Sequence, residues 1–303
     1  MSAICKHLIS LDELSPDGLK QVLDLADRQK AAPRAHREAA PLRGKVAGLF
    51  FEKPSLRTRL SFEAGMLELG GHCIYMGPES GKLGVREPLK DTARVAARYL
   101  DALIVRVMKH ESIEELARHS SVPVINALSD ESHPCQALAD LQTIREKLGR
   151  IQGVRVAFVG DGNNVARSLA RGLSKLGGKL TLSAPEGFRF SEAFVKSLHD
   201  PGCVSLEADP RKAVAGADIV YTDVWTSMGQ EEEAQRRLRA FAGYQVNLDL
   251  LALAPKALLM HDLPAHRGEE ITDEAIDAPQ SVIYDQAENR LHAQRALLTL
   301  MLG

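Results

Sequence analysis

The stretch at residues 45–63 reads Lys-Val-Ala-Gly-Leu-Phe-Phe-Glu-Lys-Pro-Ser-Leu-Arg-Thr-Arg-Leu-Ser-Phe-Glu. Residues 45–51 form a short apolar run that is typical of a buried strand, and Pro54 ends this run. Apolar side chains then recur at helical spacing between Leu60 and Leu69. A strand that turns directly into a helix is the repeating unit of α/β proteins, and the stretch therefore predicts that class of fold.

The turn between this strand and this helix has the composition of an anion site. Ser55, Arg57, Thr58 and Arg59 supply hydroxyl and guanidinium groups where the helix begins. The first N–H groups of a helix lack internal partners and carry partial positive charge, so an anion such as a phosphate binds there. The alternative is an ordinary N-cap at Ser55, with the arginines in solvent.

The alternation of strands and helices continues along the chain and predicts two domains. Strands are expected at 46–51, 73–76, 102–107, 124–127, 155–159, 179–183, 219–222 and 257–260. Helices are expected at 16–29, 58–69, 88–99, 113–119, 136–148 and 285–300. We therefore expect two α/β domains with mainly parallel sheets, residues 1–148 and 149–284, with the helix at 136–148 as a bridge. The last segment, 285–303, has no strand after it, and we expect its helix to pack back on the first domain.

The composition excludes several classes of protein. Of the 303 residues, 45% are hydrophobic and 26% are charged, and the formal net charge is -2. Nothing global attracts nucleic acid or an anionic membrane, so any anion specificity must be local. Neither a signal peptide nor a membrane span is evident, which predicts a cytoplasmic protein. The widely spaced cysteines favour reduced thiols over disulfides or a zinc knuckle; they are Cys5, Cys73, Cys135 and Cys203.

Further polar residues follow the strands of the first domain. Arg106 ends the strand at 102–107, where a buried charge needs an anionic partner; a structural salt bridge would also explain it. His133 and Gln136 lie at the start of the bridging helix, where Pro134 suits the first turn. A histidine at a helix N-terminus tends to stay neutral and can donate a hydrogen bond to a carbonyl oxygen, although it can also be a simple helix-start residue.

The second domain has comparable clusters at the ends of its strands. Asp223 follows the strand at 219–222 and suits the amino group of a ligand. The turn after the strand at 257–260 carries potential metal ligands, but they lack the spacing of a helical metal motif and Pro264 interrupts them, so we expect no metal there. These candidate ligands are His261, Asp262, His266 and Glu269.

A Gly-rich turn follows the first strand of the second domain. Gly160 and Gly162 imitate a dinucleotide-binding turn, but Val165 stands where the last glycine of that pattern belongs. We therefore expect no nucleotide at this turn. A nucleotide-dependent oxidoreductase remains an alternative that the broken glycine pattern opposes.

Five motifs together resemble the aspartate/ornithine carbamoyltransferase family, in matching order over nearly the whole chain. They are Ser55-Leu-Arg-Thr-Arg, His133-Pro-Cys-Gln-Ala-Leu-Ala-Asp, Asp161-Gly-Asn-Asn, Asp223-Val-Trp-Thr-Ser-Met-Gly and His261-Asp-Leu-Pro. The Ser-Met-Gly run, the paired Asn163-Asn164 and the segment Tyr244-Gln-Val-Asn247 are similar to the ornithine branch of that family. The resemblance implies two α/β domains joined by two helices and assembled as a homotrimer with shared active sites.

The resemblance also implies an activity and its residues. The implied reaction transfers the carbamoyl group of carbamoyl phosphate to the δ-amine of L-ornithine, giving L-citrulline and phosphate in arginine biosynthesis or catabolism. This reaction needs no cofactor. Catalytic roles are implied for Thr58, Arg106, His133 and Asp262. The implied carbamoyl phosphate site comprises Ser55, Leu56, Arg57, Thr58, Lys82, Arg106, His133, Gln136, Leu263 and Arg290. The implied ornithine site comprises Asn164, Asp223, Ser227 and Met228.

The sequence departs from the ornithine pattern at Leu56, Lys82 and Asp262, which stand where the family usually has threonine, glutamine and cysteine. A carboxylate at Asp262 faces an anionic substrate unless it is paired, and the loop that holds Lys82 reaches the neighbouring subunit's site in this family. We therefore expect Lys82 and Asp262 to form a compensating pair between subunits. Alternatively, Asp262 recognises or deprotonates a different amine, such as an N-acylated ornithine, putrescine or lysine. A non-catalytic relative is a third possibility, which the intact phosphate motif opposes.

Overall fold

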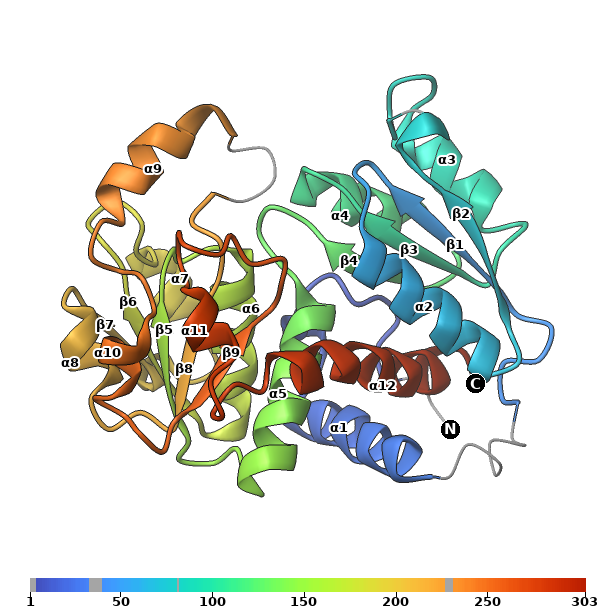
Figure 1. The fold of residues 1–303 in the computed structure, drawn as a ribbon. Helices are drawn as coiled ribbons and strands as arrows, with labels where there is room; N and C mark the ends of the chain where they lie inside the picture. The colour runs from blue at the N-terminus through green and yellow to red at the C-terminus, as the bar shows by residue number, and fades with distance from the viewer. Residues whose placement is uncertain (1–3, 33–39, 81, 227–230) are drawn as a thin grey trace. The chain divides into compact units, whose positions relative to one another are not determined.

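The computed structural model describes residues 4–32, 40–80, 82–226 and 231–303, and the chain divides into two compact units. Unit 1 comprises Met1–Gln142 and Glu288–Gly303, and unit 2 comprises Thr143–Ala287. The chain passes from one unit to the other within helices α5 (Pro134–Leu148) and α12 (Ile283–Leu302) (Figure 1). The predicted fold class, two α/β domains with mainly parallel sheets, is confirmed.

Unit 1 is built on a parallel sheet with strand order β2-β1-β3-β4. Its strands are β1 (Val46–Phe51), β2 (His72–Met76), β3 (Ala102–Arg106) and β4 (Val124–Leu128). Its other helices are α1 (Pro16–Ala31), α2 (Leu56–Glu68), α3 (Leu89–Ala96), α4 (His110–His119) and the 3₁₀ helices Leu11–Glu13 and Pro78–Ser80. The chain goes from β1 to β2 on one side and then returns to β3 on the other. A crevice for ligands forms at such a switch point, here at the carboxyl ends of β1 and β3.

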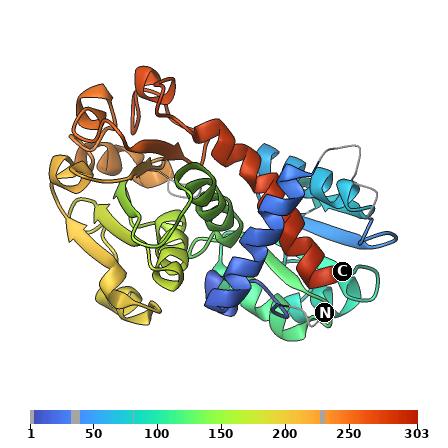
Figure 2. The same ribbon diagram turned by 90° about the horizontal axis from the view of Figure 1, so that it is seen from below.

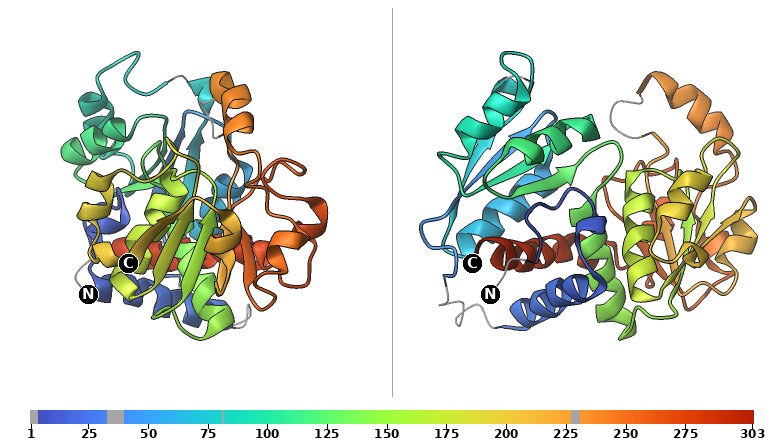
Figure 3. Two further views of the ribbon diagram at one scale, coloured as in Figure 1. Left: turned by 90° about the vertical axis from the view of Figure 1, so that its left-hand side faces the viewer. Right: turned by 180° about the vertical axis from the view of Figure 1, so that it is seen from behind.

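Side chains from both faces of this sheet are buried, which explains the continuous apolar runs in its strands. Leu103 and Val105 of β3 pack with Ile113 of α4 and Ala93 of α3. Both helices lie in front of the sheet when the molecule is seen from behind (Figure 3, right). Because successive side chains of a strand alternate in direction, the neighbours of these two residues in β3 face the opposite side, toward α2.

Helices α1 and α12 pack against each other in unit 1 and cross at an angle (Figures 1 and 2). Lys30 Nζ of α1 donates to Asn289 Oδ1 at 2.9 Å, and Gln29 Nε2 donates to Thr299 Oγ1 at 3.1 Å. These bonds hold the C-terminal helix in unit 1 although it is more than 250 residues away in the sequence. Among the helices in the described ranges, none has the length and apolar character needed to cross a membrane.

Unit 2 repeats the architecture on a parallel sheet with strand order β7-β6-β5-β8-β9. Its strands are β5 (Arg155–Val159), β6 (Lys179–Ser183), β7 (Val204–Glu207), β8 (Ile219–Thr222) and β9 (Leu258–His261). Its helices are α6 (Asn164–Leu176), α7 (Glu192–Ser197), α8 (Pro210–Val214), α9 (Ala234–Ala240), α10 (Leu248–Leu251), α11 (Asp273–Ile276) and the 3₁₀ helices Pro201–Cys203 and Glu231–Glu233. The switch point lies between β5 and β8.

The two faces of this second sheet are filled differently. Ala157 and Val159 of β5 join Val220 of β8 in a buried apolar cluster that includes residues of α8, α10 and α11. On the alternate positions, Phe158 stacks on Tyr221 with ring centroids 4.9 Å apart. The central strands β5 and β8 are therefore held rigidly, and they carry polar residues at their carboxyl ends.

Candidate active site

A buried threonine hydroxyl lies at the centre of the polar cluster in unit 1. Thr58 is in the first turn of α2 and is 1% exposed. Its Oγ1 accepts hydrogen bonds from Arg106 Nη1 at 3.5 Å and from Arg290 Nη2 at 3.2 Å. Two buried guanidinium groups thus converge on one oxygen at the β1–β3 switch point, which concentrates positive charge there.

Gln136 completes this cluster from helix α5. Its Oε1 accepts from Arg290 Nη1 at 2.6 Å, and its Nε2 donates to Asp140 Oδ1 at 2.9 Å. Arg290 therefore bridges α2 and α5 within unit 1, with one nitrogen on Thr58 and the other on Gln136. A planar, bidentate guanidinium of this kind is well suited to a phosphate or carboxylate oxygen.

The arginine of β3 lies at a local irregularity of the sheet. Arg106 pairs with Leu128 whereas Val105 pairs with Asn126, so Ala127 is passed over in β4. Such an extra residue bends the strand locally and redirects side chains, and bulges are frequent beside active sites. The irregularity lies where Arg106 turns its side chain to Thr58.

His133, which precedes α5, is 3% exposed. Burial lowers its pKa well below 6.5, and the positive charges of Arg290 and Arg106 lower that pKa further. The imidazole is consequently neutral at pH 7, in the protonation state that the sequence predicts, and burial is the largest cause. A neutral ring can donate to an oxygen on which negative charge develops.

Ser55 occupies the N-cap position of α2 without making a capping hydrogen bond. Elsewhere in the chain, Ser15 Oγ accepts from Gly18 N at 3.0 Å and Ser191 Oγ accepts from Phe194 N at 3.2 Å. The Ser55 side chain differs from these ordinary caps, which weakens the alternative interpretation of this turn. Arg57, beside it, is half-buried, and Leu56 is exposed.

Arg59 does not join the anion cluster, contrary to the prediction from the sequence. Its Nε donates to Glu63 Oε1 at 2.9 Å, and its guanidinium lies over the Tyr75 ring at 3.9 Å from the centroid. The reason is helical spacing: Glu63 is one turn further along α2 on the same face, so the pair forms locally.

In unit 2, Asp223 at the end of β8 is held by an asparagine that follows β5. Asn163 Nδ2 donates to Asp223 Oδ2 at 2.6 Å, while Asn163 Oδ1 accepts from the N–H groups of Val165 and Ala166 at 3.0 Å. Asn163 is thus both the N-cap of α6 and the support of the carboxylate. The sequence indicated Asn164 as the ligand; its Oδ1 accepts from Val165 N at 3.0 Å.

A further arginine, Arg237, links the Gly-rich turn of unit 2 with the Asp223 loop. Arg237 Nη1, on α9, donates to Asp161 Oδ2 at 2.6 Å and to the carbonyl oxygen of Trp225 at 2.9 Å. Burial raises the pKa of Asp161, and its bond with Arg237 opposes that shift. Arg237 lies in no recognisable motif, so this role is not evident from the sequence alone.

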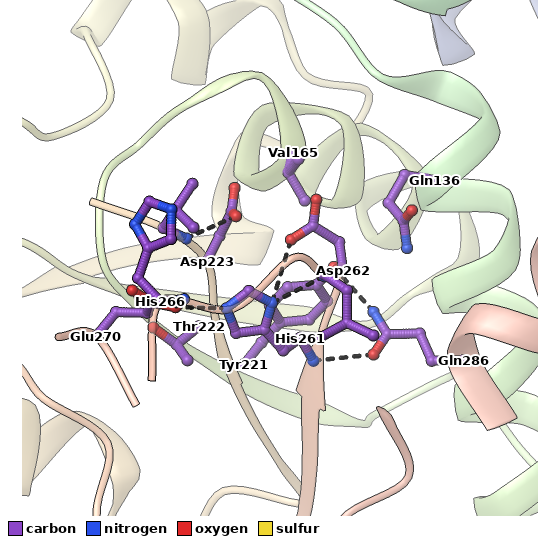
Figure 4. Close-up of polar contacts among 12 residues, drawn as sticks. Gln136, Val165, Tyr221, Thr222, Asp223, His261, Asp262, His266, Glu270 and Gln286 are labelled. Atoms are coloured by element: carbon purple, nitrogen blue, oxygen red, sulfur yellow. Dashed lines mark hydrogen bonds and ion pairs between the residues drawn. The ribbon is translucent and has the colours of Figure 1, made fainter. Parts of the chain in front are cut away.

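Three side chains gather at the carboxyl ends of β8 and β9: Asp223, His261 and Asp262 each place one atom within 4.8 Å of the others (Figure 4). His261 is fully buried; its Nδ1 accepts from Leu263 N at 2.9 Å and its Nε2 lies 3.0 Å from Glu270 Oε1. A cation on this imidazole would have to displace one of these partners. The geometry therefore favours a site for an organic amine over a metal site.

Two family models match the chain, one over most of unit 1 and one over most of unit 2. The model of the aspartate/ornithine carbamoyltransferase carbamoyl-P binding domain matches residues 6–146, and that of the Asp/Orn binding domain matches residues 152–301. The chain belongs to the aspartate/ornithine carbamoyltransferase family. The resemblance predicted from the motifs is confirmed.

Similar members of the family include bacterial and archaeal enzymes. Ornithine carbamoyltransferase of Symbiobacterium thermophilum is 49% identical over 98% of both chains. The anabolic ornithine carbamoyltransferase of Pyrococcus furiosus is 48% identical over 98% of this chain and 96% of its own. A solved structure of the P. furiosus enzyme matches with a TM-score of 0.95 at 47% identity, covering 100% of this chain and 99% of that one. The structure of the Thermus thermophilus enzyme gives 0.90 at 43% identity, covering 98% and 99%.

Two further predictions from the sequence concern loop residues, namely Lys82 and the pair Ser227 and Met228. Lys82 is exposed and lines a pocket of about 420 Å³ in unit 1, together with Glu52, Arg86 and Glu87. Ser227 and Met228 lie outside the described residues. Of the residues predicted for carbamoyl phosphate, the structure brings Thr58, Arg106, Gln136 and Arg290 into one hydrogen-bonded group.

Proposed function

We propose that this protein transfers the carbamoyl group of carbamoyl phosphate to the δ-amine of L-ornithine and releases L-citrulline and phosphate. The observation that carries the proposal is the convergence of Arg106 and Arg290 on the buried hydroxyl of Thr58. An oxyanion with several negative oxygens suits such a cluster. The names of the similar enzymes agree with this reaction.

Unit 1 would hold carbamoyl phosphate. Ser55, Arg57, Thr58 and Arg290 would bind the phosphate, together with the N–H groups that begin α2, including that of Leu56. Within the same substrate, the carbamoyl group would be bound by Arg106, His133, Gln136 and the backbone of Leu263. Lys82 would reach the phosphate of a neighbouring subunit.

The chemistry needs a neutral amine and a stabilised carbonyl oxygen. The amine nitrogen attacks the carbamoyl carbon, the bond from that carbon to the phosphate oxygen breaks with its electron pair, and the amine loses a proton. A free alkyl amine has a pKa of about 10.4, so desolvation and nearby cations must favour its neutral form. Negative charge grows on the carbonyl oxygen, where Arg106, neutral His133 and Thr58 can each contribute about 2–4 kcal/mol, as donors do at other oxyanion sites.

Unit 2 would hold the amino-acid end of ornithine. Asp223, oriented by Asn163, suits the α-ammonium group, because an ion pair within hydrogen-bond distance favours the charged form. Asn164, Ser227 and Met228 would complete the contacts with the α-amino and α-carboxylate groups. Binding both substrates in one fixed arrangement supplies part of the rate through orientation.

A second candidate function is transfer to another amine. It is favoured by Asp262, which brings a second carboxylate close to Asp223. Two carboxylates suit a second cationic or neutral amine group, as in putrescine or lysine. In either reaction Asp262 would accept the proton that the attacking amine loses.

An acceptor screen tests both candidates. The purified protein is incubated with carbamoyl phosphate and, in turn, with ornithine, N-acetylornithine, putrescine, lysine and aspartate, and each carbamoylated product is quantified. Ornithine should give the highest kcat/KM. A higher value with another amine would support the second candidate, whereas phosphate release without any carbamoylated product would exclude both and favour a non-catalytic relative.

We further propose a homotrimer with shared sites, located in the cytoplasm. Support for an assembly comes from apolar side chains on α2 and the edge strand β2, since Leu60 is 55% exposed and Ile74 is 51% exposed. If Lys82 pairs with Asp262 of a neighbouring subunit, their effects on carbamoyl phosphate affinity must be coupled. Lys82→Gln, Asp262→Cys and the double variant measure this coupling, and additive effects would exclude the pair.

A further inference from the structure

A buried carboxylate and a buried imidazole lie beneath the turn that follows β9. Both Glu270 and His261 are 0% exposed, and His261 Nε2 lies 3.0 Å from Glu270 Oε1. On the other side of the ring, the N–H group of Leu263 donates to His261 Nδ1 at 2.9 Å. Figure 4 shows the imidazole between Glu270 and Asp262.

These bonds determine which ring nitrogen carries the proton. A backbone N–H group can only donate, so Nδ1 must present its lone pair to Leu263. The proton of the neutral ring is therefore on Nε2 and is donated to Glu270. In this form the 3.5 Å approach of Nδ1 to Asp262 Oδ1 is not an ion pair, because both atoms are acceptors.

The same carboxylate also anchors the far end of the turn. Glu270 Oε1 accepts a second hydrogen bond, at 2.7 Å, from the backbone N–H of His266. The backbone of His261 is held as well, because its N–H group donates to Gln286 Oε1 at 2.9 Å. One carboxylate thus holds both the imidazole and the end of the segment that contains Asp262 and Leu263.

Leu263 needs such support because its backbone is in a costly conformation. Its φ is +58°, and it is the one non-glycine residue with a positive φ among the residues that the structure describes. For an L-residue with a bulky side chain the left-handed region costs about 1–2 kcal/mol. The bond from Leu263 N to His261 Nδ1 offsets part of this cost.

We propose that Glu270 and His261 are positioning residues that set the geometry of Asp262 and Leu263. Neither would touch substrate. Glu270 fixes the tautomer and orientation of His261, and His261 holds Leu263 in its left-handed conformation, which directs the Asp262 carboxylate and the Leu263 carbonyl group. The assignment of those two residues to the reacting end of the substrates rests on the proposed function.

Kinetics of three variants test the positioning role. Glu270→Ala removes the acceptor and should lower kcat 10- to 100-fold, as loss of an orienting partner does elsewhere, with a smaller change in the KM for carbamoyl phosphate. Glu270→Gln keeps an acceptor oxygen for both donors and should remain within about threefold of wild type, by the same reasoning. The matched control is Glu269→Ala, which removes the adjacent, partly exposed carboxylate and should leave kcat unchanged.

Two kinetic results would overturn the proposal: wild-type kcat in folded Glu270→Ala, or a loss in Glu270→Gln as large as that in Glu270→Ala.

Crystal structures of Glu270→Gln and Glu270→Ala give a test that does not depend on turnover. Leu263 should keep its positive φ in the first and leave it in the second; unchanged backbone in both would refute the positioning role. If wild type carbamoylates no amine yet Leu263 changes as expected, the proposed function fails while the positioning pair stands. Where Glu270→Ala does not fold, His261→Asn replaces it, since Asn keeps an acceptor near Leu263 but loses the contact with Glu270.

Discussion

The hydroxyl group of Thr58 accepts from two guanidinium groups that are themselves almost fully buried. Like charges at this separation repel, and burial reduces the screening of that repulsion by water. A bound phosphate would remove the repulsion and would be attracted by both groups. The convergence of two buried arginines on Thr58 is therefore more consistent with a substrate site than with a role in stabilising the fold.

Removal of one of these arginines should affect catalysis more than folding. Arg106→Ala should lower kcat by about 10²–10³, the loss seen when one donor of an oxyanion site is removed. Arg59→Ala is the matched control, because Arg59 belongs to the same region but pairs with Glu63. Steady-state kinetics and circular dichroism of both variants provide the measurement; near-normal turnover in Arg106→Ala would contradict its assigned role.

The depressed pKa of His133 predicts a specific pH dependence of stability. Burial and the two arginines hold this pKa well below 6.5 in the folded protein, whereas in the unfolded chain it returns to about 6.5. Below pH 6.5 the unfolded state therefore binds a proton that the native state does not. The free energy of unfolding should decrease by up to about 1.4 kcal/mol for each unit by which the pH is lowered.

Urea unfolding of wild type and His133→Gln between pH 7.5 and about 5 tests this sign. Other histidines contribute equally to both proteins and cancel in the difference. Wild type should lose stability relative to His133→Gln as the pH falls. A constant difference between the two proteins would show that His133 does not titrate with a lowered pKa.

At the scale of elements, each sheet places its polar cluster at a switch point. Thr58 and Arg106 follow β1 and end β3 in unit 1, and Asn163 and Asp223 follow β5 and β8 in unit 2. In each unit a hydrogen bond joins the residues found at the carboxyl ends of the two strands that flank the switch point. The common topology explains why the functional residues are far apart in sequence and close in each unit.

The two roles of Asn163 can be separated by substitution. Asn163→Ser keeps an N-cap oxygen for α6 but loses the donor to Asp223, so stability should change little while the KM for the amine substrate rises. Asn163→Ala loses both interactions and should also cost about 1 kcal/mol of stability. Thermal unfolding and KM for ornithine are the measurements. Equal KM values for Asn163→Ser and wild type would show that Asp223 does not depend on this support.

Strands could be predicted from the sequence where a run of apolar residues was bounded by turn residues. The strands at 155–159, 179–183 and 219–222 are observed with the predicted bounds, because each is a buried strand of parallel sheet. Strand β7 was missed because it lies at the sheet edge and half of its side chains are exposed, which leaves no apolar run. Helix α2 begins at Leu56, two residues before the predicted start, because helical spacing of apolar residues cannot locate a first turn that faces a ligand site.

The candidate site was predictable only in part. Residues at strand ends, such as Thr58 and Asp223, follow from the topology of parallel sheets. The roles of Asn163 and Arg237 depend on side-chain hydrogen bonds between distant segments, and that of Glu270 depends on a contact across a nine-residue turn, which no local periodicity encodes. Arg59 was wrongly included because a local partner on the helix competes for it.

For the whole molecule, charge is unevenly distributed. The formal net charge is only -2, yet two buried guanidinium groups converge at one site. Attraction of an anionic substrate is therefore a short-range effect, and it persists at ionic strengths that screen surface charges. The exposed surface of unit 1 has a different character, because apolar side chains on α2 and β2 line it.

These apolar side chains predict the assembly. Leu60 on α2 is 55% exposed and Ile74 on β2 is 51% exposed, and exposed apolar groups on neighbouring elements mark interaction surfaces. Leu60→Glu or Ile74→Lys should dissociate the proposed trimer, because an unpaired charge in an apolar interface costs several kcal/mol. Leu206→Glu, on the edge strand of unit 2 and 46% exposed, is the control and should leave the mass unchanged.

Sedimentation velocity and turnover, measured on the same samples, distinguish the consequences of dissociation. If Lys82 completes a neighbouring site, monomers of Leu60→Glu should retain their secondary structure and lose most of their activity, with KM for carbamoyl phosphate raised as in Lys82→Gln. Full activity in a monomer would show that each chain carries a complete site. A wild-type protein that sediments as a monomer would instead exclude the trimer itself, and the apolar surface of α2 and β2 would need another partner to cover it.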